Sequence, residues 1–210
     1  MRIISGERRG AKLLTPKGTY TRPTRGRVKE ALFNILSGHQ FINIITRRIV
    51  IDAFAGSGAL GLEALSRGAA LSIFIENDQN AIKTLEQNIH KLDYHHRARI
   101  IRADACTMGI PATEEAGLVI MDPPYKLDLA YPCMEALKKG GWIGDETILV
   151  LEHGSTKEPD HPSWLECFKI QKYGVTHLFF YRKKGRIRCS QNTSIPVSYT
   201  HLTLPTKRIV

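Results

Sequence analysis

Residues 49–61 read IVIDAFAGSGALG, and this stretch decides the fold class. Its first three residues form an apolar run typical of a buried strand, and a helical pattern begins at residue 60. Between them, Gly56, Gly58 and Gly61 have the spacing GxGxxG. Glycine permits the positive φ and the close approach that a strand-to-helix turn around a nucleotide needs. The stretch therefore predicts a nucleotide-binding turn in an α/β protein.

Strand and helix patterns alternate along the rest of the chain. Strands are predicted over 49–51, 71–75, 99–101, 118–121 and 148–151. Helices are predicted over 28–36, 60–66, 80–92 and 129–138. Two last strands, 168–174 and 176–182, leave no room for a helix between them and predict an antiparallel edge hairpin. We therefore expect an α/β fold with a mostly parallel seven-stranded sheet.

Composition and motif spacing predict one main domain with appendages. The chain has 210 residues with 42% hydrophobic and 24% charged residues, which is ordinary for a soluble globular protein. It lacks a run of the ~20 apolar residues that a membrane span needs. The four cysteines form no CxxC pair, which argues against a disulfide framework or a zinc site and fits the cytoplasm. We expect a basic N-terminal extension over 1–38, the main domain over 39–184, and a disordered or non-native tail over 185–210.

The two ends of the chain are strongly basic. The formal net charge is +10, and its excess lies in residues 1–30 and 181–210. Within the first segment, residues 3–20 read as a short strand with turns, and residues 21–27 as a basic loop. Clustered cations either keep flexible ends soluble or form a footprint for nucleic-acid phosphates. Composition leaves both interpretations open.

Three acidic residues follow predicted strands near the glycine turn. Asp52 precedes the turn, and Glu76 stands twenty residues after Gly56, the spacing for a carboxylate that binds ribose hydroxyls. Asp104 follows the third strand and could hold an adenine amino group. The alternatives are a turn without ligand, and helix caps at Glu76 and Asp104. An NAD site is a further alternative, but Asp52 suits a cationic ligand better than a pyrophosphate.

A second motif, Asp122-Pro123-Pro124-Tyr125, follows the predicted strand 118–121, where open α/β sheets bind ligands. The exocyclic amine of a nucleobase is a poor nucleophile because its lone pair is delocalised. A carboxylate and a rigid proline carbonyl can accept its two N–H groups and stabilise positive charge as it attacks the sulfonium methyl of S-adenosylmethionine. Tyr125 can stack on the base. This chemistry needs no metal, and the structural alternative is a rigid turn.

With these residues, the chain resembles the bacterial RsmD-type methyltransferases of 16S ribosomal RNA, which methylate guanine N2 with S-adenosylmethionine. The resemblance runs from Met1 to about Lys183 and includes an early Ile-Ser-Gly. Its blocks are 22–36, 52–68, 76–78, 122–125 and 173–174. At Arg25-Gly26 the chain departs from the family, which usually has Thr-Asp or similar after Pro-Thr. The resemblance implies a Rossmann-like class I methyltransferase fold.

The resemblance also implies the roles of individual residues. Asp122, Pro123, Pro124 and Tyr125 would hold the guanine, and segment 22–30 would close over the cofactor. The cofactor site would comprise Asp52, Phe54, Gly56, Gly58, Glu76, Asp104 and Ala105. We hypothesise that an arginine set contacts RNA phosphates beside the base pocket: Arg8, Arg9, Arg22, Arg25 and Arg27.

We expect a cytoplasmic monomer that acts on 16S ribosomal RNA within a small-subunit particle, without a metal or a membrane. One alternative is an adenine-N6 DNA or RNA methyltransferase, because the same motif serves that amine. A second is a non-catalytic RNA-binding assembly factor, against which the acids at 76, 104 and 122 argue. A third is an NAD oxidoreductase.

Overall fold

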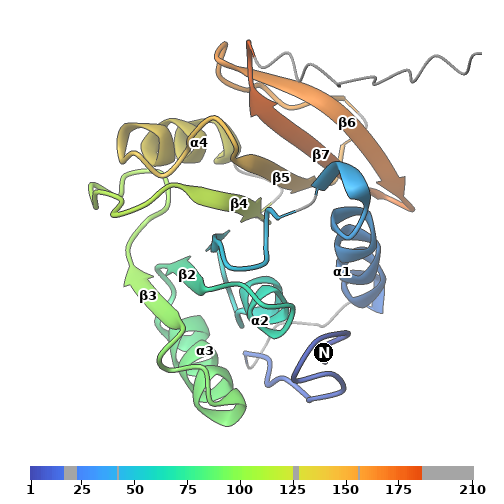
Figure 1. Cartoon of the computed structure of the whole chain (residues 1–210), viewed down its shortest axis with the longest axis vertical. Helices are drawn as coiled ribbons and strands as arrows, with labels where there is room; N and C mark the ends of the chain where they lie inside the picture. The colour runs from blue at the N-terminus through green and yellow to red at the C-terminus, as the bar shows by residue number, and fades with distance from the viewer. Residues whose placement is uncertain (17–22, 42, 125–127, 156, 186–210) are drawn as a thin grey trace, which may run out of the picture.

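The computed structural model describes residues 1–16, 23–41, 43–124, 128–155 and 157–185, with the side chains of the first helix from residue 26 on. A seven-stranded sheet in the order β3-β2-β1-β4-β5-β7-β6 runs through its centre (Figure 1). The strands are β1 (Ile49–Ala53), β2 (Leu71–Glu76), β3 (Ala98–Arg102), β4 (Ala116–Met121), β5 (Ile148–His153), β6 (Leu165–Tyr173) and β7 (Thr176–Lys183). The first five are parallel, whereas β7 is antiparallel to both β5 and β6. The predicted α/β sheet with its antiparallel edge hairpin is confirmed.

Helices cover both faces of this sheet (Figure 1). They are α1 (Pro23–Leu36), α2 (Ala59–Ser66), α3 (Gln79–Leu92) and α4 (Ala130–Lys139), with a short 3-10 helix at His39–Phe41. Side chains of α1, α2 and α3 belong to one buried hydrophobic cluster, and those of α4 belong to a second. None of the helices in the described ranges has the length and apolar character needed to cross a bilayer.

The sequence of strand β1 is almost wholly apolar because both faces of the strand are covered. All five of its residues are buried. Val50 belongs to the cluster under α1, α2 and α3, whereas Ile49 and Ile51 belong to the cluster under α4. Because successive side chains of a strand point to opposite faces, a strand covered on both sides needs apolar residues at every position. The ligand-facing polar residues must then lie at the strand ends.

Helix α1 begins earlier than its sequence pattern indicates. The segment 21–27 is predicted as a basic loop, but the helix starts at Pro23, so the prediction is wrong for residues 23–27. Proline suits the first helical position because its fixed φ matches the helix and its missing N–H is not needed there. Residues 21 and 22 lie outside the described part of the chain.

The N-terminal segment folds back on itself and packs onto the helices. The N–H of Ile3 donates to the carbonyl of Ala11 at 2.9 Å, and that of Leu13 donates to the carbonyl of Met1 at 2.9 Å. Ile3 and Leu13 are buried in the same cluster as Phe33 of α1. The division into segments 1–38, 39–184 and 185–210 stays a prediction, and residues 186–210 lie outside the described part.

Candidate active site

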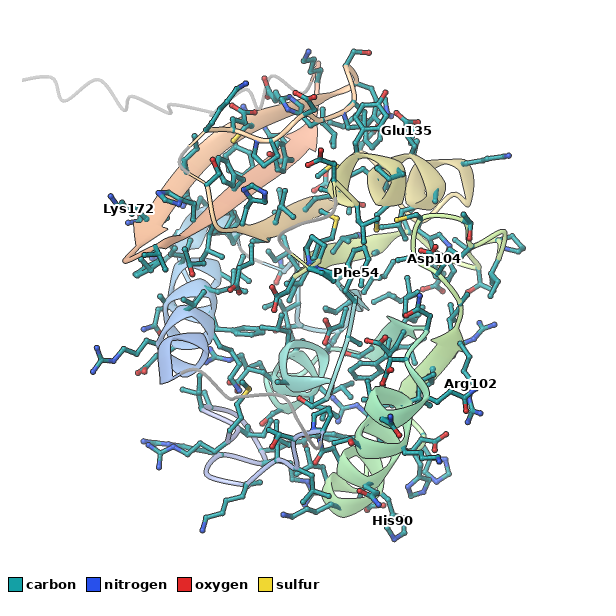
Figure 2. All side chains as sticks on the ribbon, turned by 180° about the vertical axis from the view of Figure 1, so that it is seen from behind. Phe54, His90, Arg102, Asp104, Glu135 and Lys172 are labelled. Atoms are coloured by element: carbon teal, nitrogen blue, oxygen red, sulfur yellow. The ribbon has the colours of Figure 1, made fainter. Side chains whose placement is uncertain are left out.

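A cavity of about 510 Å³ opens at the carboxyl ends of the parallel strands. Its wall contains eight predicted residues: Asp52, Phe54, Gly56, Glu76, Asp104, Ala105, Asp122 and Pro124. Two of them, Phe54 and Asp104, are labelled in Figure 2. Gly58 and Pro123 are buried beside the wall without lining it, and Tyr125 lies outside the described residues. The residues come together because parallel strands present their carboxyl ends at one edge.

The glycine turn is tight on one side and open on the other. Gly58 has φ 78° and precedes α2, and a Cβ there would lie 2.3 Å from Cδ1 of Leu85. A Cβ on Gly61 would lie 2.3 Å from Cε1 of Phe74. Around Gly56, by contrast, the position of a Cβ has no atom within 4 Å. The last two glycines therefore pack the turn against α3 and β2, and the first leaves room on the cavity side.

Asp52 lies at the end of β1 and anchors α2. Its side chain is 1% exposed, and its Oδ2 accepts the N–H of Gly61 at 2.8 Å. The first turn of a helix has unsatisfied N–H groups, so this bond holds the start of α2 against β1. Burial raises the pKa of Asp52 to about 8, the Gly61 bond opposes the rise, and the charges of Asp122 and Glu76 add to it.

This raised pKa gives a testable dependence of stability on pH. The unfolded carboxyl titrates near its ordinary pKa and the folded one near 8, so the folded state binds the extra proton between them. Protonation of Asp52 therefore stabilises the folded state fully below about pH 4. This stabilisation is lost as the pH rises to about 8, at up to about 1.4 kcal/mol per pH unit. We expect urea unfolding to show wild type losing more stability than Asp52→Asn between pH 5 and pH 8. Equal losses would contradict the burial argument.

Glu76 ties the glycine turn to the end of β2. Its Oε2 accepts the N–H of Gly56 at 2.7 Å, and its Oε1 accepts the N–H groups of Asn77 and Asp78, both at 2.9 Å. The cap of α3 is Asp78, whose Oδ1 accepts the N–H of Ala81 at 2.7 Å. The helix-cap interpretation of Glu76 is therefore wrong, because its neighbour performs that task.

Asp104 both lines the cavity and closes a turn. It is exposed after β3, and its Oδ1 accepts the N–H of Cys106 at 2.9 Å. Ala105 beside it is 3% exposed and contributes apolar wall. Residues 105–107 form a turn and not a helix, so the helix-cap alternative for Asp104 is wrong. Its second carboxylate oxygen gives the cavity a hydrogen-bond acceptor.

The strand β4 delivers the second motif to the same cavity. Asp122 is half-buried, Pro123 is buried and Pro124 is exposed. Asp122 lies close enough to Asp52 for its charge to raise the pKa of that carboxyl. The turn at 122–124 therefore brings a carboxylate and a proline to the wall that the glycine turn also forms.

Two charged residues on the wall are not among the site residues predicted from the sequence. Lys29 of α1 is 3% exposed and Glu152 of β5 is 8% exposed. The signal for Glu152 was present, because it directly follows the predicted strand 148–151. Lys29 is expected only as part of segment 22–30, which the resemblance places over the cofactor, and not as an individual site residue.

Lys29 is held by a buried carboxylate, Glu63 of α2. Glu63 is fully buried and accepts four hydrogen bonds: from the N–H of Ile4 at 2.8 Å, the N–H of Ser5 at 3.0 Å, Nζ of Lys29 at 3.0 Å and Nε of Arg67 at 2.8 Å. Nζ of Lys29 also donates to the carbonyl of Arg2 at 2.8 Å. Burial lowers the pKa of Lys29, and the charge of Glu63 opposes that shift. This network fastens the N-terminal segment and α1 to the wall of the cavity.

Comparison with known proteins places these features in a family. Residues 1–182 match the family described as conserved hypothetical protein 95. The chain is 38% identical to ribosomal RNA small subunit methyltransferase D of Escherichia coli over 72% of this chain and 74% of the relative. The methyltransferase D of Haemophilus influenzae is 31% identical to this chain, over 87% of this chain and 93% of the relative. The solved structure of yhhF from Escherichia coli has a TM-score of 0.73 and 34% identity, covering 89% of this chain and 99% of that one.

Proposed function

The chain belongs to the conserved hypothetical protein 95 family, that of the RsmD-type methyltransferases, and from this we propose that it transfers a methyl group from S-adenosylmethionine to the N2 amine of a guanine in 16S ribosomal RNA. The resemblance found in the sequence is confirmed, and the fold is the Rossmann-like class I methyltransferase fold. The exact amine, the cofactor and the site roles are our proposals.

One observation carries the proposal: the glycine turn and the Asp122 motif form one wall. Glu76, which we propose binds the ribose, and Asp122, which we propose binds the base, line the same cavity. Among the described residues, five acids line it beside one lysine, Lys29: Asp52, Glu76, Asp104, Asp122 and Glu152. At the glycine-turn end of the wall, Asp52, Glu76 and Asp104 fit a cofactor with a sulfonium, an ammonium and ribose hydroxyls, whereas they would repel the pyrophosphate of NAD. The residues present therefore fit S-adenosylmethionine.

The residues divide into two groups by their place on the sheet. Glu76 is the last residue of β2, and Asp104 and Ala105 follow β3. These three would hold the ribose and the adenine, and Asp52 would face the cationic part. Asp122 and Pro124 lie after β4 and would hold the target base. When bound, S-adenosylmethionine supplies an electrophilic methyl group. Asp122 accepts an N–H of the amine, orients its lone pair and stabilises the positive charge that develops on nitrogen.

The test is transfer of labelled methyl groups to small-subunit particles and to naked 16S ribosomal RNA, followed by nucleoside analysis. We expect labelled N2-methylguanosine. Labelled N6-methyladenosine would support the adenine alternative instead, and binding of RNA without methyl transfer would support a non-catalytic assembly factor.

Glu76 gives the next prediction. Glu76→Ala removes charge-assisted hydrogen bonds worth about 1.5–3 kcal/mol, so we expect cofactor binding to weaken roughly 10- to 100-fold. The matched control is Asp78→Ala, which removes the cap of α3 but no acceptor from the cavity. It should cost about 1 kcal/mol of stability and leave cofactor affinity unchanged. Calorimetric affinities that match wild type for Glu76→Ala would remove Glu76 from the cofactor site.

A second, basic groove adjoins the cavity. Its volume is about 740 Å³, and it shares Met1 and Lys29 with the first cavity. The cationic side chains on its wall are Arg2, Arg9, Lys12, Arg27 and Lys29, against one acid, Glu30. Phosphates gain from such clustered cations through release of counterions. We propose that RNA phosphates beside the target base lie in this groove.

The arginines predicted to contact RNA do not all line this groove. Arg9 and Arg27 line the groove, whereas Cζ of Arg8 lies 5.8 Å from the ring centroid of Tyr94 and is absent from the groove wall. Arg22 and the side chain of Arg25 lie outside the described part of the chain. Their RNA contacts stay predictions.

This arrangement predicts unequal effects of arginine removal. For Arg9→Ala/Arg27→Ala we expect weaker RNA binding, and a plot of log affinity against log salt that is flatter by about 0.7–0.9 per lost contact. The methylated nucleotide should not change, because phosphate contacts carry little sequence information. Arg8→Ala is the matched control and should keep the wild-type slope. Equal slopes for all three proteins would mean that the groove does not bind phosphates.

A further inference from the structure

Glu152 is a buried carboxylate on the cavity wall that the chemistry described so far does not use. It is the next-to-last residue of β5 and is 8% exposed. Met121 of β4 lies opposite Leu151 of β5, and the two strands are parallel. The next residues, Asp122 and Glu152, therefore follow at the same level and on the same face of the sheet. Both line the cavity.

The order of the strands places Glu152 at the base end of the cavity. The sheet runs β3-β2-β1-β4-β5, so Glu152 is three strands from Glu76. At a strand spacing of about 4.8 Å, this separates the two strand ends by about 14 Å. Glu152 is thus a neighbour of the residue proposed to hold the amine and is remote from the proposed ribose site.

The chemistry of the amino bases makes a second carboxylate here selective. An ionised carboxylate only accepts hydrogen bonds. In guanine, the N2 amine is flanked by a ring N–H at N1. In adenine and cytosine, the ring nitrogen that flanks the amine on the Watson–Crick edge carries a lone pair and no hydrogen. A carboxylate beside the amine therefore binds guanine and repels the other two bases.

We propose that Glu152 is the residue that selects guanine: its carboxylate accepts the N1–H while Asp122 accepts from the N2 amine. This inference rests on the proposed function and names the feature that restricts the substrate to one base. Enzyme sites built around a substrate hydrogen bond discriminate strongly against analogues that lack it, because the buried partner is left unpaired.

The test replaces the target guanine of the RNA by 2-aminopurine, which keeps the amine at C2 but has an unprotonated N1. We expect the single-turnover methylation rate of wild type to fall at least 100-fold on this substrate. In Glu152→Gln, the amide can donate to that N1 and its oxygen can still accept from guanine. We therefore expect the guanine-to-aminopurine ratio of Glu152→Gln to fall to about 10 or less, with cofactor affinity unchanged.

The outcomes separate this inference from the function on which it rests. If wild type forms no N2-methylguanosine on unsubstituted RNA, the proposed function fails and the inference fails with it. If wild type methylates both bases within threefold, or Glu152→Gln keeps the wild-type ratio, guanine selection by Glu152 is wrong while the function stands. Should Glu152→Gln not fold, the same ratio is measured for Glu152→Ala, which removes the acceptor and should also lower it; a wild-type ratio in that variant would overturn the assignment to Glu152.

Discussion

Asp122→Ala is expected to lower the single-turnover rate of methyl transfer by about 100- to 1,000-fold, the range for removing one preorganised charge-stabilising group. Cofactor affinity should stay within about threefold of wild type, because Asp122 acts on charge that develops only in the transition state. The variant should also lower the raised pKa of Asp52, since the charge of Asp122 contributes to that shift.

The measurement is rapid-mixing methylation with saturating enzyme, paired with calorimetry of cofactor binding. Asp122→Asn keeps one acceptor oxygen without the charge and should lie between wild type and Asp122→Ala. Asp128→Ala removes an exposed carboxylate from the segment that follows and serves as the control. A rate for Asp122→Ala within threefold of wild type would refute the proposed role of this carboxylate.

Glu63→Ala is expected to lower the free energy of unfolding by about 3–5 kcal/mol, the usual cost of removing one partner from a buried ion pair. Four donors lose their acceptor at once, and Lys29 is left as a buried charge without its carboxylate. Urea denaturation provides the measurement. Glu86→Ala is the control, because Glu86 forms an ion pair with Arg102 in which both side chains are largely exposed. It should cost less than about 1 kcal/mol.

A paired substitution separates the charge from the packing. Replacing both Glu63 and Lys29 by methionine removes the two charges together and keeps most of the buried volume. Such replacements of buried pairs are often neutral or stabilising, so we expect the double variant to be more stable than Glu63→Ala. If Glu63→Ala alone costs less than 1 kcal/mol, the network does not hold the N-terminal segment.

The features that could be predicted from the sequence are those whose pattern lies within a single strand or helix. Apolar runs located all seven strands, and the rule that ligands bind at carboxyl ends located Asp52, Glu76, Asp104 and Asp122 on one wall. The same rule reaches Glu152, but the predicted strand ended one residue before it. The start of α1 was misplaced because proline and glycine beside three arginines resemble a loop, although proline is well suited to a first helical turn.

Contacts between distant segments could not be predicted. Nothing local marks Glu63 as buried, because its donors at Ile4 and Ser5 lie 59 and 58 residues away. Likewise, the density of arginines near residue 8 does not reveal that Arg8 lies against Tyr94 while Arg9 lines the groove. The monomeric state, the cytoplasmic location and the assembled particle as substrate stay predictions.

The distant partners of the first fourteen residues also set an order on folding during synthesis. Leu14 exchanges hydrogen bonds with Asn88 of α3, at 2.8 Å from its N–H and 3.0 Å to its carbonyl, across 74 residues. At a translation rate of about 5–20 residues per second, Asn88 is added roughly 4–15 s after Leu14. Segment 1–14 therefore completes its docking only after α3 has been synthesised. A nascent chain that stops before α3 can pair Ile4 and Ser5 with Glu63, but it leaves Leu14 without Asn88.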